Sequence, residues 1–168
     1  MTTGVSVNTF AHTAAFITDK MLHSLQQLIR LSGLSPEWLA QDWDTLERGF
    51  KQWINDHDLT MVTLEVWRPA TNVLVGRWDF DIDYGYDADG SGGMWVDTDA
   101  IRYAINKAGT WPSICSYRVI ATTLPGRAAV RGWSSTAFRS TAGFQRHSIG
   151  TTIGAPGAAM GTVYWRKN

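Results

Sequence analysis

The spacing of apolar residues changes once along this chain, and that change restricts the fold more than any single motif does. Over residues 10–29, large apolar side chains recur every three or four positions, which predicts a long helix with one buried face. In TMVTLEVWRPATNVLVGRWDFDIDY, residues 60–84, apolar and polar residues alternate on both sides of PATN, which predicts two strands joined by a turn. The chain therefore combines helices with an antiparallel sheet.

Capping residues and turn signals mark the remaining elements. In SPEW, Ser35 is the predicted N-cap and Pro36 the first residue of a second helical region that continues to about Asn55. Asp97 or Thr98 is predicted to cap a third helix. Two further strands are predicted at SYRVIATT, residues 116–123, and TVYWRK, residues 162–167. The order indicates an α+β fold in a single domain, with a small antiparallel sheet backed by about three helices.

The alternation also assigns side chains of the predicted hairpin to two faces. The core face of its second strand is expected to carry Leu74, Trp78, Phe80, Ile82 and Tyr84. The opposite, solvated face is expected to carry Arg77, Asp79, Asp81 and Asp83.

Opposite charges are segregated along the chain, although its net charge is zero. Residues 1–99 hold all fifteen acidic and six basic side chains, and residues 100–168 hold nine basic and no acidic ones, so the two parts carry −9 and +9. Either the parts neutralise one another across one surface, or the basic part meets an acidic partner. A nucleic-acid-binding module is an alternative function, with Trp133, Phe138 and Phe144 as stacking platforms.

Motifs of known chemistry are missing from the sequence. DFDIDYGYDADG does not fit a calcium-binding loop, because alignment on Gly90 places Gly85 and Val96 at ligand positions. The four histidines lack ligand spacing, and a single cysteine permits neither a disulfide nor a multi-cysteine zinc site. The enzymatic alternatives would use Cys115 with His147, or Asp79, Asp81 and Asp83 with a divalent ion. Because these motifs are missing, we expect no enzymatic activity, no metal and no cofactor.

The predicted location is the cytoplasm, without contact with a membrane. No apolar run reaches the roughly 18 to 20 residues of a membrane span. The N-terminal MTTGVSVNTFAHTAAF lacks the basic start of a signal peptide.

The chain after Leu124 has large side chains but no period until residue 162. RGWSSTAFRSTAGFQRHSIG, residues 131–150, carries three arginines, two phenylalanines and a tryptophan without a helical stripe or strict alternation. Loops longer than about 12 to 15 residues are uncommon in compact domains and are often functional. The aromatic residues weigh against disorder, so this segment is predicted to pack on the rest of the chain.

Several stretches of the chain together resemble the bacterial HORMA-domain family. They are FITDKM (16–21), LSGLSPEW (31–38), LVGRWDFDIDYGY (74–86), MWVDTDAIRYAINKAG (94–109), and LPGR (124–127) followed by GWSSTAFRSTAGF (132–144). The resemblance runs in order from about Phe10 to Arg166. It implies a HORMA fold, in which a mobile C-terminal segment, the safety belt, occupies two positions on a fixed core.

The resemblance divides the chain into a flexible handle at residues 1–8, a core at 9–123 and a safety belt at 124–168. It implies that the closed belt wraps an extended closure-motif peptide, which joins the sheet by strand addition. The residues it implies for contact with the peptide or the belt are Trp133, Phe138, Arg139, Phe144, Tyr164 and Trp165. For Trp133, Phe138, Tyr164 and Trp165, burial in the core is the alternative.

The resemblance also implies partners. Family members are encoded in anti-phage operons of the CBASS type, beside a cGAS-like nucleotidyltransferase and an AAA+ remodelling ATPase. The closed protein is expected to activate the nucleotidyltransferase, and the ATPase is expected to reopen the belt by pulling on the handle. The handle residues are Thr2, Thr3, Gly4, Val5, Ser6, Val7 and Asn8, for which a frayed terminus is the alternative.

Overall fold

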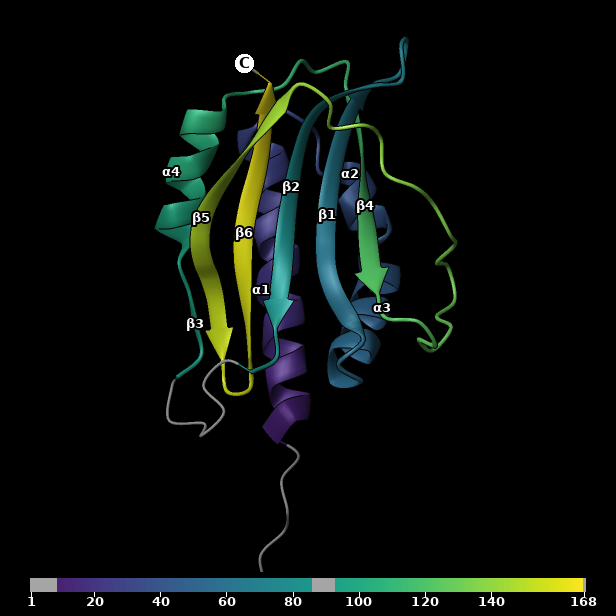
Figure 1. Cartoon of the computed structure of the whole chain (residues 1–168), viewed down its shortest axis with the longest axis vertical. Coiled ribbons are helices and arrows are strands. Elements are labelled where there is room, and N and C mark those ends of the chain that lie inside the picture. Colours follow the sequence, from purple (N-terminus) through teal and green to yellow (C-terminus); the bar gives the residue numbers. More distant parts are fainter. Residues whose placement is uncertain (1–8, 86–92, 168) are drawn as a thin grey trace, which may run out of the picture.

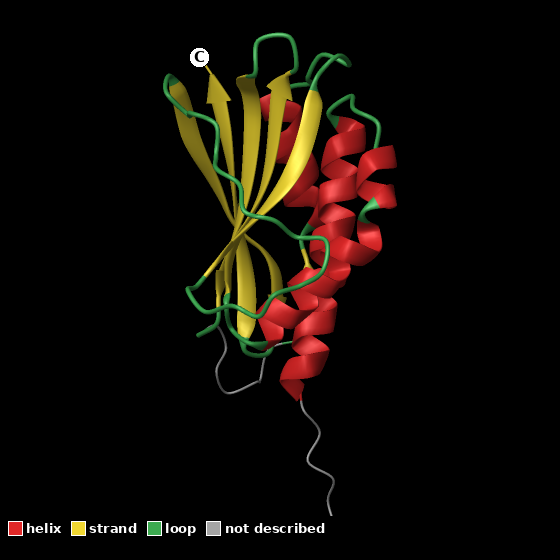
Figure 2. Cartoon of the chain, turned by 90° about the vertical axis from the view of Figure 1, so that its right-hand side faces the viewer, coloured by secondary structure: helices red, strands yellow, loops and turns green. Residues whose placement is uncertain are grey.

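The computed structural model of the chain describes residues 9–85 and 93–167, and in this part four helices lie on one face of a six-stranded antiparallel sheet (Figures 1 and 2). The helices are α1 (Thr9–Leu31), α2 (Glu37–Gln41), α3 (Trp43–Asn55) and α4 (Thr98–Ala108). The strands are β1 (Leu59–Arg68), β2 (Val73–Asp83), β3 (Trp95–Val96), β4 (Ser116–Thr123), β5 (Phe144–Ala155) and β6 (Ala158–Lys167). The predicted α+β class is confirmed, with four helices instead of about three.

The long apolar stripe forms α1, as predicted. Its fully buried side chains face the sheet, because positions three and four apart lie on one side of a helix. They include Ile17, Met21, Leu22, Leu25, Leu28 and Ile29. No helix in residues 9–85 and 93–167 is both long and apolar enough to cross a membrane.

The second predicted helix is two helices, which corrects the sequence analysis. Asp42 ends α2 and precedes α3, and its backbone torsions, φ −96° and ψ 6°, leave the helical range. The break allows Leu39 of α2 and Leu46 of α3 both to be buried. Ser35 does not cap as predicted, since α2 begins at Glu37, although Ser35 Oγ accepts a hydrogen bond from the Glu37 N–H (3.3 Å).

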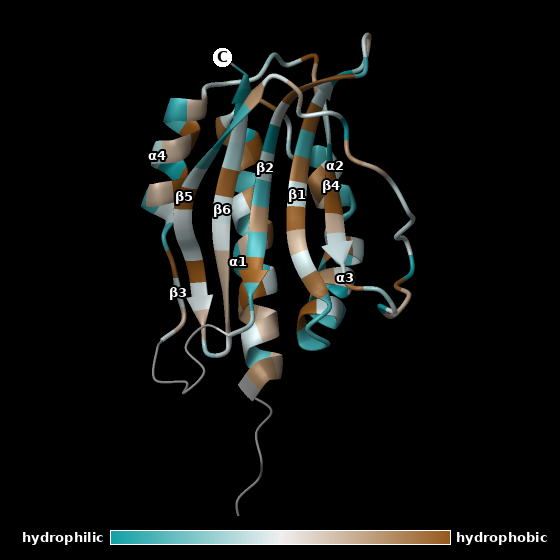
Figure 3. Ribbon diagram, viewed as in Figure 1, coloured by the Kyte–Doolittle hydropathy of each residue, from teal (hydrophilic) through white to brown (hydrophobic). Residues whose placement is uncertain are grey.

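The order of the described strands is β3-β5-β6-β2-β1-β4. The predicted β1–β2 hairpin forms, and β4 pairs with the other edge of β1. This register places Glu65 of β1 opposite Arg77 of β2 and opposite Arg118 of β4. Figure 3 shows hydrophobic and hydrophilic bands along β2, as the period of two requires.

The C-terminal hairpin, β5 with β6, corrects the prediction of a single strand at residues 162–167. The sequence hides β5 because its pairing with β6 shifts between Ser148 and Gly150 and again between Thr151 and Ile153. Each such bulge changes the face that the next side chain meets, so no alternation survives. β6 pairs with β2 and so extends the sheet on the side away from β4.

Asp97 begins α4, in agreement with the predicted cap. Its side chain accepts a hydrogen bond from the Ala100 N–H (3.0 Å), and Gly109 ends the helix at φ +85°. Before α4 the two-residue strand β3, which was not predicted, pairs with β5. Close contact is permitted there by Gly154, since a Cβ on it would lie 2.4 Å from Trp95 Nε1.

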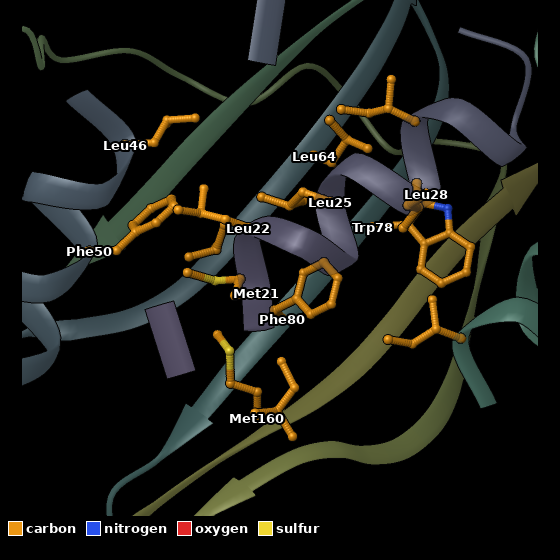
Figure 4. Close-up of a cluster of buried hydrophobic side chains, with 14 of the residues drawn as sticks. Met21, Leu22, Leu25, Leu28, Leu46, Phe50, Leu64, Trp78, Phe80 and Met160 are labelled. Carbon is orange, nitrogen blue, oxygen red and sulfur yellow. The ribbon is translucent and has the colours of Figure 1, made fainter. Parts of the chain in front are cut away.

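The core lies between α1, α3 and the sheet (Figure 4). Side chains of α1 meet those of three strands, and α3 closes one end of the cluster. The residues labelled in Figure 4 are Met21, Leu22, Leu25, Leu28, Leu46, Phe50, Leu64, Trp78, Phe80 and Met160.

We expect Leu22→Ala to lower the free energy of unfolding by about 2 to 5 kcal/mol, because it leaves a cavity in the core. The matched control is Leu31→Ala, since Leu31 is on the same helix but is exposed, and it should change stability by less than about 0.5 kcal/mol. Urea denaturation measures both. Equal effects would contradict the packing of α1.

Candidate functional site

β4 forms one edge of the described sheet. β4 pairs with β1 on one side, and no described strand covers its other edge. The chain then leaves β4 as the crossing segment, residues 124–143, and passes over this edge to reach β5; Figure 2 looks onto the edge and shows the segment across it. Alternate residues of an edge strand direct their N–H and C=O groups outward, so this edge offers a template for another strand.

Trp133 anchors the crossing segment on α3, at the helix layer. Its ring centroid lies 4.9 Å from that of Trp53 and 5.5 Å from that of Phe50. Trp133 Nε1 donates to the carbonyl oxygen of Thr45 (2.9 Å). Gly49 leaves space for the ring, because a Cβ there would lie 2.4 Å from Trp133 Nε1.

Arg139 anchors the same segment on the opposite face of the sheet, at the fully buried carboxylate of Glu65. The Arg139 N–H donates to Glu65 Oε2 (2.8 Å), and its guanidinium pairs with Glu65 Oε1. Arg118 Nε of β4 also donates to Glu65 Oε1 (2.9 Å). The Arg139 guanidinium lies 3.8 Å from the Trp67 ring centroid and donates from Nη2 to Asn72 Oδ1 (2.6 Å).

These two anchors place the crossing segment around the free edge. Trp133 lies with the helices and Arg139 on the outer face, so residues 133–139 pass around β4 between them. Arg118 reaches outward to this part of the segment and donates from Nη1 to Thr136 Oγ1 (2.7 Å). A pocket lies on each side of this edge. The pocket against α2 has a volume of about 380 Å³, and the pocket beneath residues 136–140 has a volume of about 610 Å³.

The prediction of a solvated face on the hairpin is wrong at Asp79, which is only 4% exposed, and at Arg77, whose side chain is only 11% exposed. Asp79 Oδ1 accepts hydrogen bonds from Thr63 Oγ1 (2.7 Å) and Arg77 Nε (2.9 Å), and Oδ2 accepts one from Trp165 Nε1 (2.8 Å). The ring of Phe138 in the crossing segment lies 4.3 Å from the Arg77 guanidinium. The aromatic side chains of the C-terminal part thus cover a face that the sequence assigned to solvent.

The acidic and basic parts of the chain meet on this outer face. Glu65 pairs with two arginines of the basic part. The pKa of Asp81 is raised above its usual value, because partial burial and the charge of Asp79 raise it more than Arg146 of β5 and Arg77 lower it. These contacts favour mutual neutralisation of the two parts. Arg118 and Arg139 of the basic part, which Glu65 holds, are not free to follow a nucleic-acid backbone, which weakens that alternative.

The other predicted site residues lie in the C-terminal hairpin. Tyr164 is buried on the helix side, with its ring centroid 5.1 Å from that of Trp78 and 4.8 Å from that of His147. Trp165 faces the opposite side, at Asp79, and Phe144 is half-buried where β5 begins. The predicted handle, residues 2–8, lies outside the described residues.

Neither catalytic alternative gains a site in the described part of the chain. Cys115 immediately precedes β4, and His147 is on β5. These two strands are four strand spacings apart, or roughly 19 Å. Burial raises the pKa of Cys115, which opposes formation of a thiolate nucleophile. Within residues 9–85 and 93–167 no three side chains of His, Cys, Asp or Glu are grouped to hold a metal ion.

Sequence reasoning did not identify Glu65, Arg118 or Gly49 as part of this site. Glu65 occupies a polar position of an alternating strand, where exposure is the ordinary expectation. Gly49 offered a signal, because glycine inside a helix costs about 1 kcal/mol relative to alanine and so suggests a close contact.

The comparisons with known proteins agree with this geometry. The family model described as bacterial HORMA domain 2 matches residues 1–168. The fold is similar to a chain of the mitotic checkpoint complex, with TM-score 0.75, 7% identity and coverage of 93% of this chain and 99% of that one. It is also similar to C. elegans HTP-2 bound to the HIM-3 closure motif, with TM-score 0.70, 12% identity and coverage of 98% and 99%.

A third similar structure is the E. coli MS115-1 HORMA:CdnC:Trip13 complex, with TM-score 0.63, 13% identity and coverage of 100% of this chain and 96% of that one. No curated protein sequence matches the chain. At these identities the structural matches establish the fold, and the predicted HORMA fold is confirmed.

We expect Trp133→Ala to release the crossing segment from α3 and to speed trypsin cleavage after Arg127, Arg131 or Arg139, because locally open backbone is accessible to proteases. Gly49→Ala should have the same effect without altering the segment, since its Cβ would occupy the space of the indole. The control is Trp38→Ala, because Trp38 is 52% exposed on α2 and does not hold the segment. Cleavage at the wild-type rate in both test variants would contradict the packing of Trp133 on α3.

A double-mutant cycle should show that Glu65 and Arg139 are coupled. Glu65→Gln alone should cost about 1.5 to 3 kcal/mol of stability, because the half-buried guanidinium groups of Arg118 and Arg139 lose their charge-assisted hydrogen bonds. With Arg139→Gln as the second variant, urea denaturation should give a coupling energy of about 1 to 3 kcal/mol.

The matched control cycle uses the exposed pair Glu47 and Lys51 on α3, whose coupling should be no more than about 0.5 kcal/mol. Equal coupling in the two cycles would show that Glu65 does not hold the segment.

Proposed function

Because the chain belongs to the bacterial HORMA domain 2 family, we propose that it is a peptide-binding conformational switch of the bacterial cytoplasm and not an enzyme. An extended closure-motif peptide adds to the free edge of β4, and the crossing segment closes over it as part of the safety belt, residues 124–168. The observation that carries this function is the path of residues 133–139 around an unpaired strand edge. Strand addition satisfies the outward N–H and C=O groups, while side-chain pockets select the sequence.

The anchors support a segment that can be released and re-formed. Trp133 and Arg139 hold it at two points on opposite sides of β4, and residues 134–138 between them are exposed. Release would expose an indole and leave Glu65 with Arg118 as its ion-pair partner. Opening the segment therefore costs free energy. A bound partner can shift the equilibrium between the closed and the open arrangement in either direction.

Structures of related fold support the partners that we propose. C. elegans HTP-2 is bound to the HIM-3 closure motif in one of these structures, and an E. coli HORMA protein forms a complex with CdnC and Trip13 in another. We propose that the present chain, closed around its peptide, binds and activates a cGAS-like nucleotidyltransferase in CBASS-type anti-phage signalling. An AAA+ ATPase reopens it through the handle at residues 2–8.

Activation should require the anchors of the crossing segment. Trp133→Ala with Phe138→Ala should weaken binding of a closure peptide by about 2 kcal/mol or more, roughly thirtyfold, if these rings hold the closed belt. Synthesis of cyclic oligonucleotide by the partner nucleotidyltransferase should fall in parallel. Fluorescence anisotropy and product chromatography measure the two effects, and unchanged binding with unchanged synthesis would contradict the proposal.

Reset should instead depend on the handle. Deletion of residues 2–8 should leave peptide capture and activation intact but make the closed protein resistant to the ATPase, because the two partners act on different parts of one two-state element. Peptide release in the presence of ATP measures this. Normal reset of the deletion variant would exclude the handle.

A further inference from the structure

A groove on the helix side of the β4 edge has the chemistry of a specificity site. It consists of two adjoining pockets, of about 380 Å³ and 190 Å³, which share Trp38 of α2 and Tyr117 of β4. We call it the α2 groove. Leu39, Leu46 and Val119 add apolar surface to the larger pocket.

From this groove we infer that the captured peptide carries large apolar side chains at two positions, i and i+2, with a lysine or arginine beside them. The inference rests on the proposed function and names the ligand class of the same site. The occupant is an extended segment of another protein.

The spacing follows from the alternation of β4. Tyr117 faces α2, since its hydroxyl donates to the Ser35 carbonyl (2.6 Å) and accepts from the Leu39 N–H (3.3 Å). Arg118 faces the other way, toward Glu65. A strand added to this edge alternates in the same manner, so side chains about 6.6 Å apart enter the two pockets while the residue between them faces the crossing segment.

The exposed indole of Trp38 supports an apolar occupant. Trp38 lines both pockets and is nevertheless 52% exposed. With Leu39, Leu46 and Val119 it gives the larger pocket an apolar lining, and contiguous apolar area commonly marks an interaction site.

The charges at the groove select the basic residue. Glu37 lines the smaller pocket and Asp42 the larger one, and neither forms an ion pair within the described residues. Arg118 also lines the larger pocket, but Glu65 and Thr136 hold its guanidinium on the opposite face. Burial raises the pKa of Tyr117, and the negative charges of Asp42 and Glu37 raise it further, so both carboxylates act on the groove.

Selection from a display library of random extended peptides on the full chain tests this inference. The wild type should enrich peptides with apolar residues two positions apart and a neighbouring lysine or arginine. For one enriched peptide, fluorescence anisotropy should give a Kd that is about tenfold weaker with Trp38→Ala, which corresponds to loss of an aromatic anchor. Tyr103→Ala, at an exposed aromatic position on α4, should leave the Kd unchanged.

The charge preference needs its own pair of variants. Glu37→Gln combined with Asp42→Asn should weaken the enriched peptide several-fold, yet should not affect the same peptide with its basic residue replaced by glutamine. Asp99→Asn on α4 is the control for loss of a distant charge. A thermal melt of each variant confirms that the substitutions, which are on the surface, leave the fold intact.

The outcomes separate this inference from the proposed function. Enriched peptides that lose affinity with Trp133→Ala but are indifferent to Trp38→Ala and to the neutralised groove would overturn the inference and leave peptide capture standing. Failure to enrich any peptide would contradict both. A concentration-dependent dimer that is abolished by Trp38→Ala would show that a second copy fills the groove and would overturn the inference.

Discussion

The pairing of β2 with β6 is the contact on which the rest of the arrangement depends. It places the C-terminal hairpin on the side of the sheet away from β4, so the β4 edge stays unpaired among the described strands. Because the hairpin follows β4 directly in the sequence, residues 124–143 must cross from one side of the sheet to the other. The free edge and the segment that encloses it therefore have the same cause.

The buried Glu65 gives the crossing segment its fixed position. Removing a carboxylate from water is costly unless charged partners and hydrogen bonds compensate for it. Here β4 supplies one partner through Arg118, and the crossing segment supplies the other through Arg139. The sheet therefore binds the segment through a charge that is not fully compensated without it, while Trp133 fixes the other end by packing on α3. One anchor is electrostatic and the other is mainly apolar, which allows salt and temperature to affect them differently.

The sequence predicted the elements whose periodicity is uninterrupted. α1, the β1–β2 hairpin and the Asp97 cap of α4 follow from local pattern and side-chain chemistry. β5 did not follow, because two bulges interrupt its alternation. Asp79 and Glu65 were beyond the reach of local pattern, since their burial is produced by side chains that are distant in sequence: Trp165 lies 86 residues from Asp79, and Arg139 lies 74 from Glu65. The loss of periodicity after Leu124 marked the start of the crossing segment, and the family resemblance assigned this part of the chain to the safety belt.

Amide hydrogen exchange of β4 tests the central claim most directly, because strand addition must protect outward N–H groups that the edge now leaves unpaired. With and without a selected peptide, exchange should slow at alternate residues of 116–123 and across the crossing segment, while α4 and β5 remain unchanged. Alternate protection along β4 would identify the added strand. Protection confined to α4 and β5, or a bound peptide that leaves the exchange of β4 unchanged, would contradict the account.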